Sequence, residues 1–153
     1  DYGMAGNYVA GANIAGFEKL AEVNGITVVD DYAHHPTEIK ATLTAAHDLD
    51  YKRVVVVFQP FTFSRTALLK DEFIEALSIA DKVILTPIMG SREINTYGIT
   101  TQDLADEIPG SVWFDTFQKV ADYLKENITD GDLVLTLGCG DVYKIAKIIL
   151  DKE

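Results

Sequence analysis

The sequence has little of several features that mark particular classes of protein. Its 153 residues hold a single cysteine, Cys139, so an internal disulfide is excluded. No apolar run approaches the roughly 20 residues that a membrane-spanning helix needs. Positive charge is scarce, since 13 lysines and arginines stand against 24 aspartates and glutamates. Because nucleic acids and anionic membranes are bound largely through Lys and Arg, the sequence predicts neither as a partner.

Further expectations concern the compartment and the domain organisation. No basic-then-apolar leader opens the sequence, and a single cysteine suits a reducing compartment, so we expect a cytoplasmic protein. A chain of this length, 48% hydrophobic and 24% charged, suits one ordinary globular domain. Residues 1–25 are rich in Gly and Ala, and we expect a loosely ordered or β-hairpin lead-in there. Within it, Phe17–Val23 is expected to pair with the next apolar run through an Asn24–Gly25 turn.

From residue 26 onwards, apolar runs of strand length alternate with amphipathic stretches of helix length. The runs are ITVVD, RVVVVF, KVILTP, SVWF and DLVLTL, which begin at Ile26, Arg53, Lys82, Ser111 and Asp132. Repeated strand-then-helix units with strands apolar on both faces are typical of a parallel sheet covered by helices. The sequence therefore predicts one α/β domain over residues 26–153: an open, mostly parallel sheet with helices on both faces.

Three local signals mark the expected helix starts. Pro36 suits the first turn of a helix, because it lacks an N–H group that would have no partner there. Thr100 or Thr101, ahead of Asp103, suits a second start, and Asp115 is predicted as the N-cap of a third.

Ionisable groups gather directly after the first run, where Asp30, Asp31, Tyr32, His34 and His35 stand within six residues. Ligands of an open parallel sheet bind beyond the carboxyl ends of its strands, so these groups are candidates for a site. Arg65 stands near another expected helix start, where a cation faces the positive end of the helix dipole and so indicates a nearby anionic ligand. Purely structural roles also remain open for three of these features. Asp31 could cap a helix, GCGD could form a tight turn, and Cys139 could be a small packing residue.

Four segments resemble the C-terminal domain of the Mur ligases in order and spacing: DDYAHHPTEI, VVVVFQPFTFSRT, SRE and LVLTLGCGDVYKIA. The resemblance covers roughly residues 17–150 and implies a Rossmann-like fold. Members of the family are ATP-dependent ligases of peptidoglycan synthesis. They consist of an N-terminal domain for a UDP-sugar, a central domain with a P-loop and Mg²⁺ ligands, and a C-terminal domain for the amino acid. The chain resembles only the last and lacks a G-x-x-x-x-G-K-[ST] motif, so we expect it to be inactive alone.

The FQP and SRT elements favour the members that join L-alanine to UDP-N-acetylmuramate through an acyl phosphate. The implied ligands are therefore ATP with Mg²⁺, L-alanine and the UDP-sugar, with the Mg²⁺ ligands expected mainly on the central domain and no metal site here. Two alternatives remain. One is a ligase that attaches a tripeptide to the same sugar in cell-wall recycling, and the other is a non-catalytic α/β nucleotide-binding module.

The resemblance also implies roles for individual residues. Asp31 resembles the family aspartate that accepts hydrogen bonds from the ATP ribose. His34 resembles the histidine beside the γ-phosphate and alanine, so it is the expected catalytic residue and a contact of both ligands. Tyr32 and Arg65 resemble groups that position alanine, whose carboxylate suits the two parallel hydrogen bonds of a guanidinium. His35 is expected to support the turn by packing or hydrogen bonding.

The sequence departs from the family pattern at four positions. Phe61 stands where histidine is usual after FQP, and Thr62 stands where some members have arginine, which bears on amino-acid selectivity. Ala15 and Gly16 stand where paired arginines are common, which bears on a phosphate contact.

Overall fold

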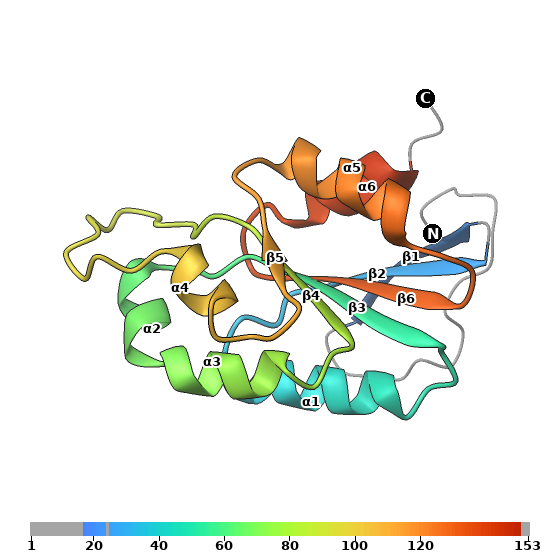
Figure 1. The fold of residues 1–153 in the computed structure, drawn as a ribbon, viewed down its shortest axis with the longest axis horizontal. Helices are drawn as coiled ribbons and strands as arrows, with labels where there is room; N and C mark the ends of the chain where they lie inside the picture. The colour runs from blue at the N-terminus through green and yellow to red at the C-terminus, as the bar shows by residue number, and fades with distance from the viewer. Residues whose placement is uncertain (1–16, 24, 151–153) are drawn as a thin grey trace.

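In the computed structural model, which describes residues 17–23 and 25–150, the described strands form one six-stranded sheet (Figure 1). The strands are β1 (Phe17–Val23), β2 (Ile26–Asp31), β3 (Arg53–Phe58), β4 (Lys82–Leu85), β5 (Val112–Trp113) and β6 (Asp132–Leu137). The helices are α1 (Pro36–His47), α2 (Phe63–Leu68), α3 (Lys70–Leu77), α4 (Thr101–Ala105), α5 (Phe117–Asn127) and α6 (Tyr143–Leu150). The α/β class predicted from the alternating runs is confirmed. Ala15 and Gly16 lie outside the described residues.

The strands are arranged in the order β1-β2-β6-β3-β4-β5. The five strands from β2 to β5 in this order are parallel, and β1 alone runs antiparallel, paired with β2. β1 is the strand expected over Phe17–Val23. The open, mostly parallel sheet predicted from the sequence is therefore present.

The two faces of the sheet carry separate apolar cores, each covered by helices. Along β3, Val54, Val56 and Phe58 belong to the core that α1 and α3 cover. Val55 and Val57 belong to the core that α5 and α6 cover. This alternation follows from the two-residue period of a strand, which sends successive side chains to opposite faces. Figure 1 shows the two helical layers above and below the sheet.

One predicted helix start is displaced by a single residue. Asp115 was expected to cap the helix that follows β5, but the N-cap is Thr116, whose side chain accepts a hydrogen bond from the backbone N–H of Lys119 over 3.1 Å. Asp115 instead lies 3.0 Å from the Lys119 ammonium. Thr116 can cap because its hydroxyl reaches the third N–H of the helix. The start expected near Thr100 is confirmed, with Thr100 as N-cap.

The chain reverses the direction in which it adds strands to the sheet when it reaches β6. From β2 to β5 the connecting helices α1, α3 and α4 pack on one face of the sheet. The chain then returns through α5 on the opposite face and inserts β6 between β2 and β3. The segments after β2 and β3 therefore lead to one face, whereas the segment after β6 leads to the other. Crevices at such switch points are the usual ligand sites of open α/β sheets.

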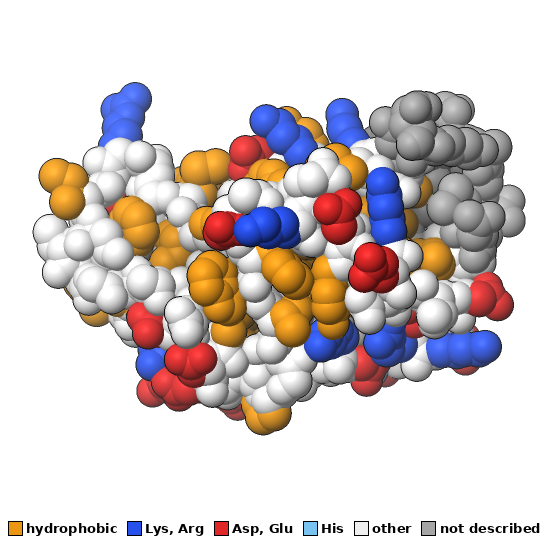
Figure 2. Space-filling view, turned by 45° about the horizontal axis from the view of Figure 1, so that its top comes forward, with side chains coloured by type: hydrophobic (Ala, Val, Ile, Leu, Met, Phe, Trp, Pro, Cys, Tyr) orange, Lys and Arg blue, Asp and Glu red, His pale blue; other side chains and the backbone are white. Residues whose placement is uncertain are grey.

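Within the described part of the chain, no helix has the length and apolar character needed to cross a membrane. On the face shown in Figure 2, Lys and Arg side chains are interspersed with Asp and Glu side chains. The excess of acidic residues is thus not gathered into one patch on that face.

Candidate functional site

Three loops begin at the same level at the carboxyl edge of the sheet. Leu137, the last residue of β6, is in register with Asp31 of β2 and with Phe58 of β3. The Gly138 N–H donates to the Asp31 carbonyl over 3.2 Å, and the Gln59 N–H donates to the Leu137 carbonyl over 3.0 Å. The loops after β2, β6 and β3 are therefore neighbours, although they are far apart in the sequence.

Asp31 holds the turn between β2 and α1 together. Its carboxylate accepts a hydrogen bond from the Ala33 N–H and another from the Thr42 hydroxyl of α1, each over 3.0 Å. The residue is only 2% exposed. Burial raises the pKa of this carboxyl above its usual value, although the two hydrogen bonds act to lower it. Asp31 thus ties the end of the strand to the helix, and its expected contact with ribose stays a prediction.

Tyr32 and His34 lie on the outer side of the same turn. Tyr32 is 63% exposed, and its ring meets that of His34 edge to face, with centroids 5.8 Å apart. His34 Nδ1 lies 3.1 Å from the Tyr32 carbonyl oxygen and 3.5 Å from Glu38 Oε1. Because both neighbours are acceptors, the proton of the neutral ring sits on Nδ1. Nε2 then carries the lone pair, as an acceptor that becomes a donor when the ring is protonated.

His35 and Glu38 cap the first turn of α1 from both sides. His35 Nδ1 accepts a hydrogen bond from the Thr37 N–H over 3.1 Å, and Pro36 occupies the first helical position, as expected. Glu38 Oε1 accepts from the N–H groups of His34 and His35 over 3.1 and 3.2 Å, and these bonds lower the pKa of Glu38. The prediction that His35 supports the turn by hydrogen bonding is confirmed.

Arg65 lies in the first turn of α2 and is half-buried. Thr62, the N-cap of this helix, accepts a hydrogen bond from the Arg65 N–H on its side-chain oxygen over 3.3 Å. Thr62 has a φ of 66°, which is strained for a β-branched residue. The position at which some family members have arginine therefore serves here as a helix cap.

Gln59 connects the loop after β3 to the loop after β6. Its Nε2 donates to Asp141 over 2.9 Å, while its Oε1 is buried without a hydrogen-bond partner among the described residues. A Cβ added at Gly140 would lie 2.6 Å from this Oε1, so only glycine fits at that distance. Gly138 has a φ of 148°, which also favours glycine.

Cys139 lies between the two halves of the site. Burial raises the pKa of its thiol, and the charges of Arg65 and Glu38 act on it in opposite senses, lowering and raising it respectively. Cys139 is partly buried, in agreement with its expected role as a packing residue. The segments that carry His34 and Arg65 therefore lie on either side of β6.

The structure thus places Asp31, Tyr32 and His34 at the turn after β2, and Arg65 in the first turn of α2, on the other side of β6. Four further residues that hold these loops received no role from the sequence: Glu38, Gln59, Glu93 and Asp141. All four belong to the segments that resemble the family, and this was the one signal that pointed to them. Among the described residues, no cluster of three or more His, Cys, Asp or Glu side chains could hold a metal ion.

The family model and the curated relatives point to one family. Residues 17–140 match the family described as "Mur ligase, glutamate ligase domain". A UDP-N-acetylmuramate--L-alanine ligase from Lachnospira eligens is 49% identical over 138 residues, which are 88% of this chain and 30% of that protein. The chain thus spans about 30% of the length of this curated relative.

Two solved structures share the fold. UDP-N-acetylmuramate-alanine ligase from Thermotoga maritima superposes with a TM-score of 0.66 at 23% identity, over 83% of this chain and 26% of that one. A domain from a putative UDP-N-acetylmuramate:L-alanyl-gamma-D-glutamyl-meso-diaminopimelate ligase of Haemophilus ducreyi superposes with a TM-score of 0.68 at 24% identity. That match covers 87% of this chain and 95% of the solved domain, so nearly the whole solved domain shares the fold.

Proposed function

The chain belongs to the Mur ligase family by its glutamate ligase domain, and we propose that it is the amino-acid-binding C-terminal domain of a ligase that joins L-alanine to UDP-N-acetylmuramate. The observation that carries the proposal is the placement of His34 and Arg65 on neighbouring loops across β6, at the switch point of the sheet. The identity of 49% to an alanine ligase supports the choice of amino acid.

In the proposed reaction, ATP first phosphorylates the sugar carboxylate. The amine of alanine then attacks the carbonyl carbon of the acyl phosphate, a C–N bond forms, and the C–O bond to the phosphoryl group breaks. Inorganic phosphate leaves, and the amine gives up a proton to the departing phosphate or to solvent. The chain contributes by orienting the amine, which a bound α-carboxylate allows.

Arg65 and His34 have different tasks in this proposal. The Arg65 guanidinium binds the α-carboxylate of alanine through two parallel hydrogen bonds, and the exposed Tyr32 ring closes one side of the amino-acid site. His34 presents Nε2 towards the γ-phosphate and the amine, where the protonated ring donates a hydrogen bond to the negative charge that develops during attack. Asp31 accepts hydrogen bonds from the ribose of ATP through the carboxylate lone pairs that Ala33 and Thr42 leave unused.

The remaining ligands belong to the parent protein as a whole. ATP and UDP-N-acetylmuramate are the partners of the proposed reaction, with Mg²⁺ held mainly by the central domain. The proposed location is the cytoplasm. In this arrangement the carboxyl edge of the sheet supplies one half of a site that the central domain completes.

The test uses the full-length protein that carries this chain. With UDP-N-acetylmuramate and ATP present, L-alanine should stimulate ADP formation and yield UDP-N-acetylmuramoyl-L-alanine, identified by mass. Stimulation by the tripeptide L-alanyl-γ-D-glutamyl-meso-diaminopimelate and not by alanine would assign the protein to cell-wall recycling. ATP binding without ADP formation under either condition would indicate a nucleotide-binding module.

A further inference from the structure

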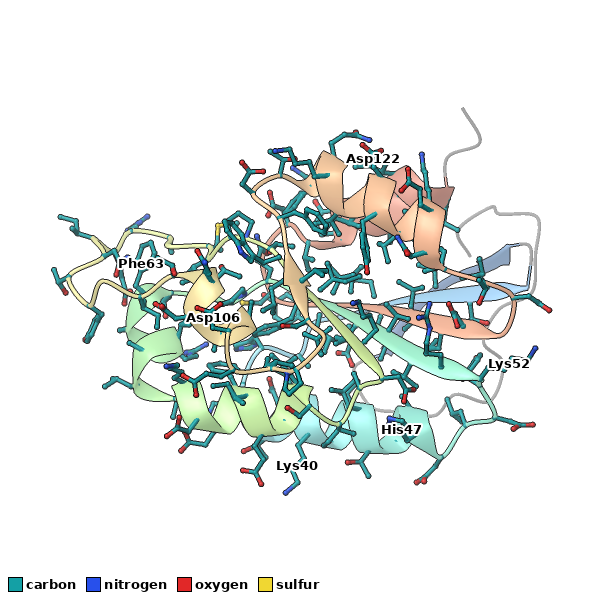
Figure 3. All side chains as sticks on the ribbon, in the orientation of Figure 1. Lys40, His47, Lys52, Phe63, Asp106 and Asp122 are labelled. Carbon is teal, nitrogen blue, oxygen red and sulfur yellow. The ribbon has the colours of Figure 1, made fainter. Side chains whose placement is uncertain are left out.

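The loop that follows β4 folds back over the segment that carries Arg65. Its Met89 bridges to the loop after β3 through two backbone hydrogen bonds of 2.8 Å, from the Thr62 N–H to the Met89 carbonyl and from the Met89 N–H to the Pro60 carbonyl. The next residue, Gly90, lies so close to Phe63 that an added Cβ would be 2.4 Å from the ring. Figure 3 shows Phe63, the first residue of α2, beside this loop.

Three residues after Gly90, Glu93 binds Ser64 at the start of α2. Its Oε1 accepts a hydrogen bond from the Ser64 N–H over 2.9 Å, and its Oε2 accepts one from the Ser64 hydroxyl over 2.5 Å. Both carboxylate oxygens are thus held by one residue, which fixes the position and the rotation of that residue together. Ser64 directly precedes Arg65, so the Glu93 carboxylate fixes the backbone from which the guanidinium extends.

Contacts from outside residues 62–68 are needed because this segment has little stability of its own. α2 has six residues, fewer than an isolated helix needs, and its N-cap Thr62 has a φ of 66°. A strained backbone persists where the surrounding contacts over-determine it. Here those contacts come from Met89 and Glu93, both in the loop after β4. The sequence interval of 29 residues between Ser64 and Glu93 shows that the contact is a tertiary one.

We propose that Glu93 is a positioning residue for the amino-acid site. It holds Ser64, and through Ser64 it sets the direction of Arg65 towards the carboxylate of the incoming amino acid. The hydrogen bonds from Ser64 lower the pKa of Glu93, and the charge of Arg65 lowers it further, so the carboxylate and the guanidinium lie in the same neighbourhood. The inference rests on the proposed function, because it assigns the amino-acid carboxylate to Arg65.

The test compares variants of the full-length enzyme by their kinetics. Glu93→Ala should raise the KM for alanine about tenfold or more, since small misplacements of a binding group are costly, and should change the KM for ATP and for the UDP-sugar less than about twofold. Glu93→Gln should recover part of the loss, because its amide oxygen still accepts one hydrogen bond from Ser64. Ser64→Ala should lie between the parent and Glu93→Ala, because it keeps the backbone donor.

Glu107→Gln provides the matched control. Glu107 is exposed as Glu93 is, and its carboxylate forms an ion pair with Lys70 at 2.5 Å instead of hydrogen bonds with Ser64. It lies between α4 and β5, and its substitution should leave the KM for alanine unchanged. An equal effect of Glu107→Gln and Glu93→Gln would overturn the proposal, because loss of any surface carboxylate would then suffice.

The double variant separates positioning from general stability. If Glu93 acts through Arg65, then Glu93→Ala should add almost nothing to the KM for alanine in an Arg65→Ala background. Effects that multiply in the double variant would overturn the inference. If Arg65→Ala alone leaves the alanine KM unchanged, the assignment of the carboxylate to Arg65 fails. If Arg65→Ala raises that KM and Glu93→Ala does not, the positioning role alone fails.

Discussion

Gln59 donates a hydrogen bond from Nε2 to Oδ1 of Asp141 over 2.9 Å and so joins the loop after β3 to the loop after β6. The other amide atom of Gln59 is buried without a hydrogen-bond partner among the described residues, under Gly140. This hydrogen bond couples the two loops. We therefore expect the stability of the domain to depend more on the hydrogen-bond donor of Gln59 than on the size of its side chain.

Replacement of this donor by an acceptor should destabilise the domain. Gln59→Glu puts a second carboxylate against Asp141 in a buried position, and we expect the free energy of unfolding at neutral pH to fall by about 2 kcal/mol or more. Gln59→Leu, of similar size, loses one hydrogen bond but also removes the unpartnered oxygen, so its loss should stay within about 1 kcal/mol. Urea unfolding of both variants measures this difference. Equal stability of the two would show that the loops are not coupled through this bond.

The two adjacent histidines should differ in kind. His35→Ala removes the side-chain cap of α1 and should lower the free energy of unfolding by about 1 kcal/mol, the usual cost of losing an N-cap. His34→Ala keeps the cap, and in the full-length enzyme it should lower kcat/KM by about tenfold or more with little change in melting temperature. Both quantities are measured for both variants. A stable, inactive His35→Ala beside an active His34→Ala would reverse the assignment.

Asp31 should show a stability cost at neutral pH. Its pKa is raised in the folded state above the ordinary 3.8, so the folded chain binds this proton more tightly than the unfolded chain. Stability from this group therefore falls as the pH rises from about 3.8 through the raised pKa, and the full cost is present above that window. Asp31→Asn removes the charge and keeps an acceptor for the Ala33 N–H.

The Asp31→Asn variant should therefore be at least as stable as the parent at pH 7, and its relative advantage should shrink in acid, where the parent carboxyl becomes neutral. Chemical unfolding of both chains at pH 7 and near pH 4 measures this difference. A variant less stable than the parent at pH 7 would mean that the hydrogen bonds of the carboxylate outweigh its burial.

Arg65→Ala in the full-length enzyme should raise the KM for alanine and affect the UDP-sugar much less. A charged hydrogen bond contributes roughly 1.5 to 3 kcal/mol, so the expected increase is about tenfold to a hundredfold. Arg65→Lys should recover little of this loss, since an ammonium cannot form the paired bonds of a guanidinium. Lys40→Ala, which removes an exposed cation from the outer side of α1 (Figure 3), is the control for charge alone. An unchanged alanine KM in folded Arg65→Ala would remove Arg65 from the site.

The 153-residue chain by itself should fold cooperatively and show no ligase activity. It contains a complete sheet with both cores covered, but no phosphate-binding loop, and each ligand would meet only part of its site. Circular dichroism during urea titration tests folding, and an ADP assay with alanine and UDP-sugar tests activity. Alanine-dependent ADP formation by the purified chain would contradict the shared site.

The sequence by itself determined most strands and helices of this fold, and it identified the polar residues at the carboxyl edge of the sheet. Strands such as Arg53–Phe58 are short continuous apolar runs, because both faces of a parallel sheet are buried, and such a run is visible without any tertiary contact. The start of α1 at Pro36 was equally visible, because it depends on neighbouring residues alone. Even the error at Asp115 was local, since Thr116 next to it has the side chain that reaches the helix N–H.

The order of the strands was decided only by the tertiary structure. The last strand, β6, lies between the first two parallel strands, and this placement brings the loops of His34 and Arg65 to either side of Cys139. Apolar runs carry no record of which neighbour they pair with, because every buried parallel strand presents similar side chains on both faces.

The residues that hold the loops of the site could not be predicted from the sequence either, because their contacts are long-range. Gln59 meets Asp141 across 82 residues, and Glu93 meets Ser64 across 29 residues. Asp31 is buried because Thr42 and α1 close over it, although its neighbours in the sequence are polar. Such contacts depend on the path of the backbone between the partners, which local periodicity and capping signals do not specify.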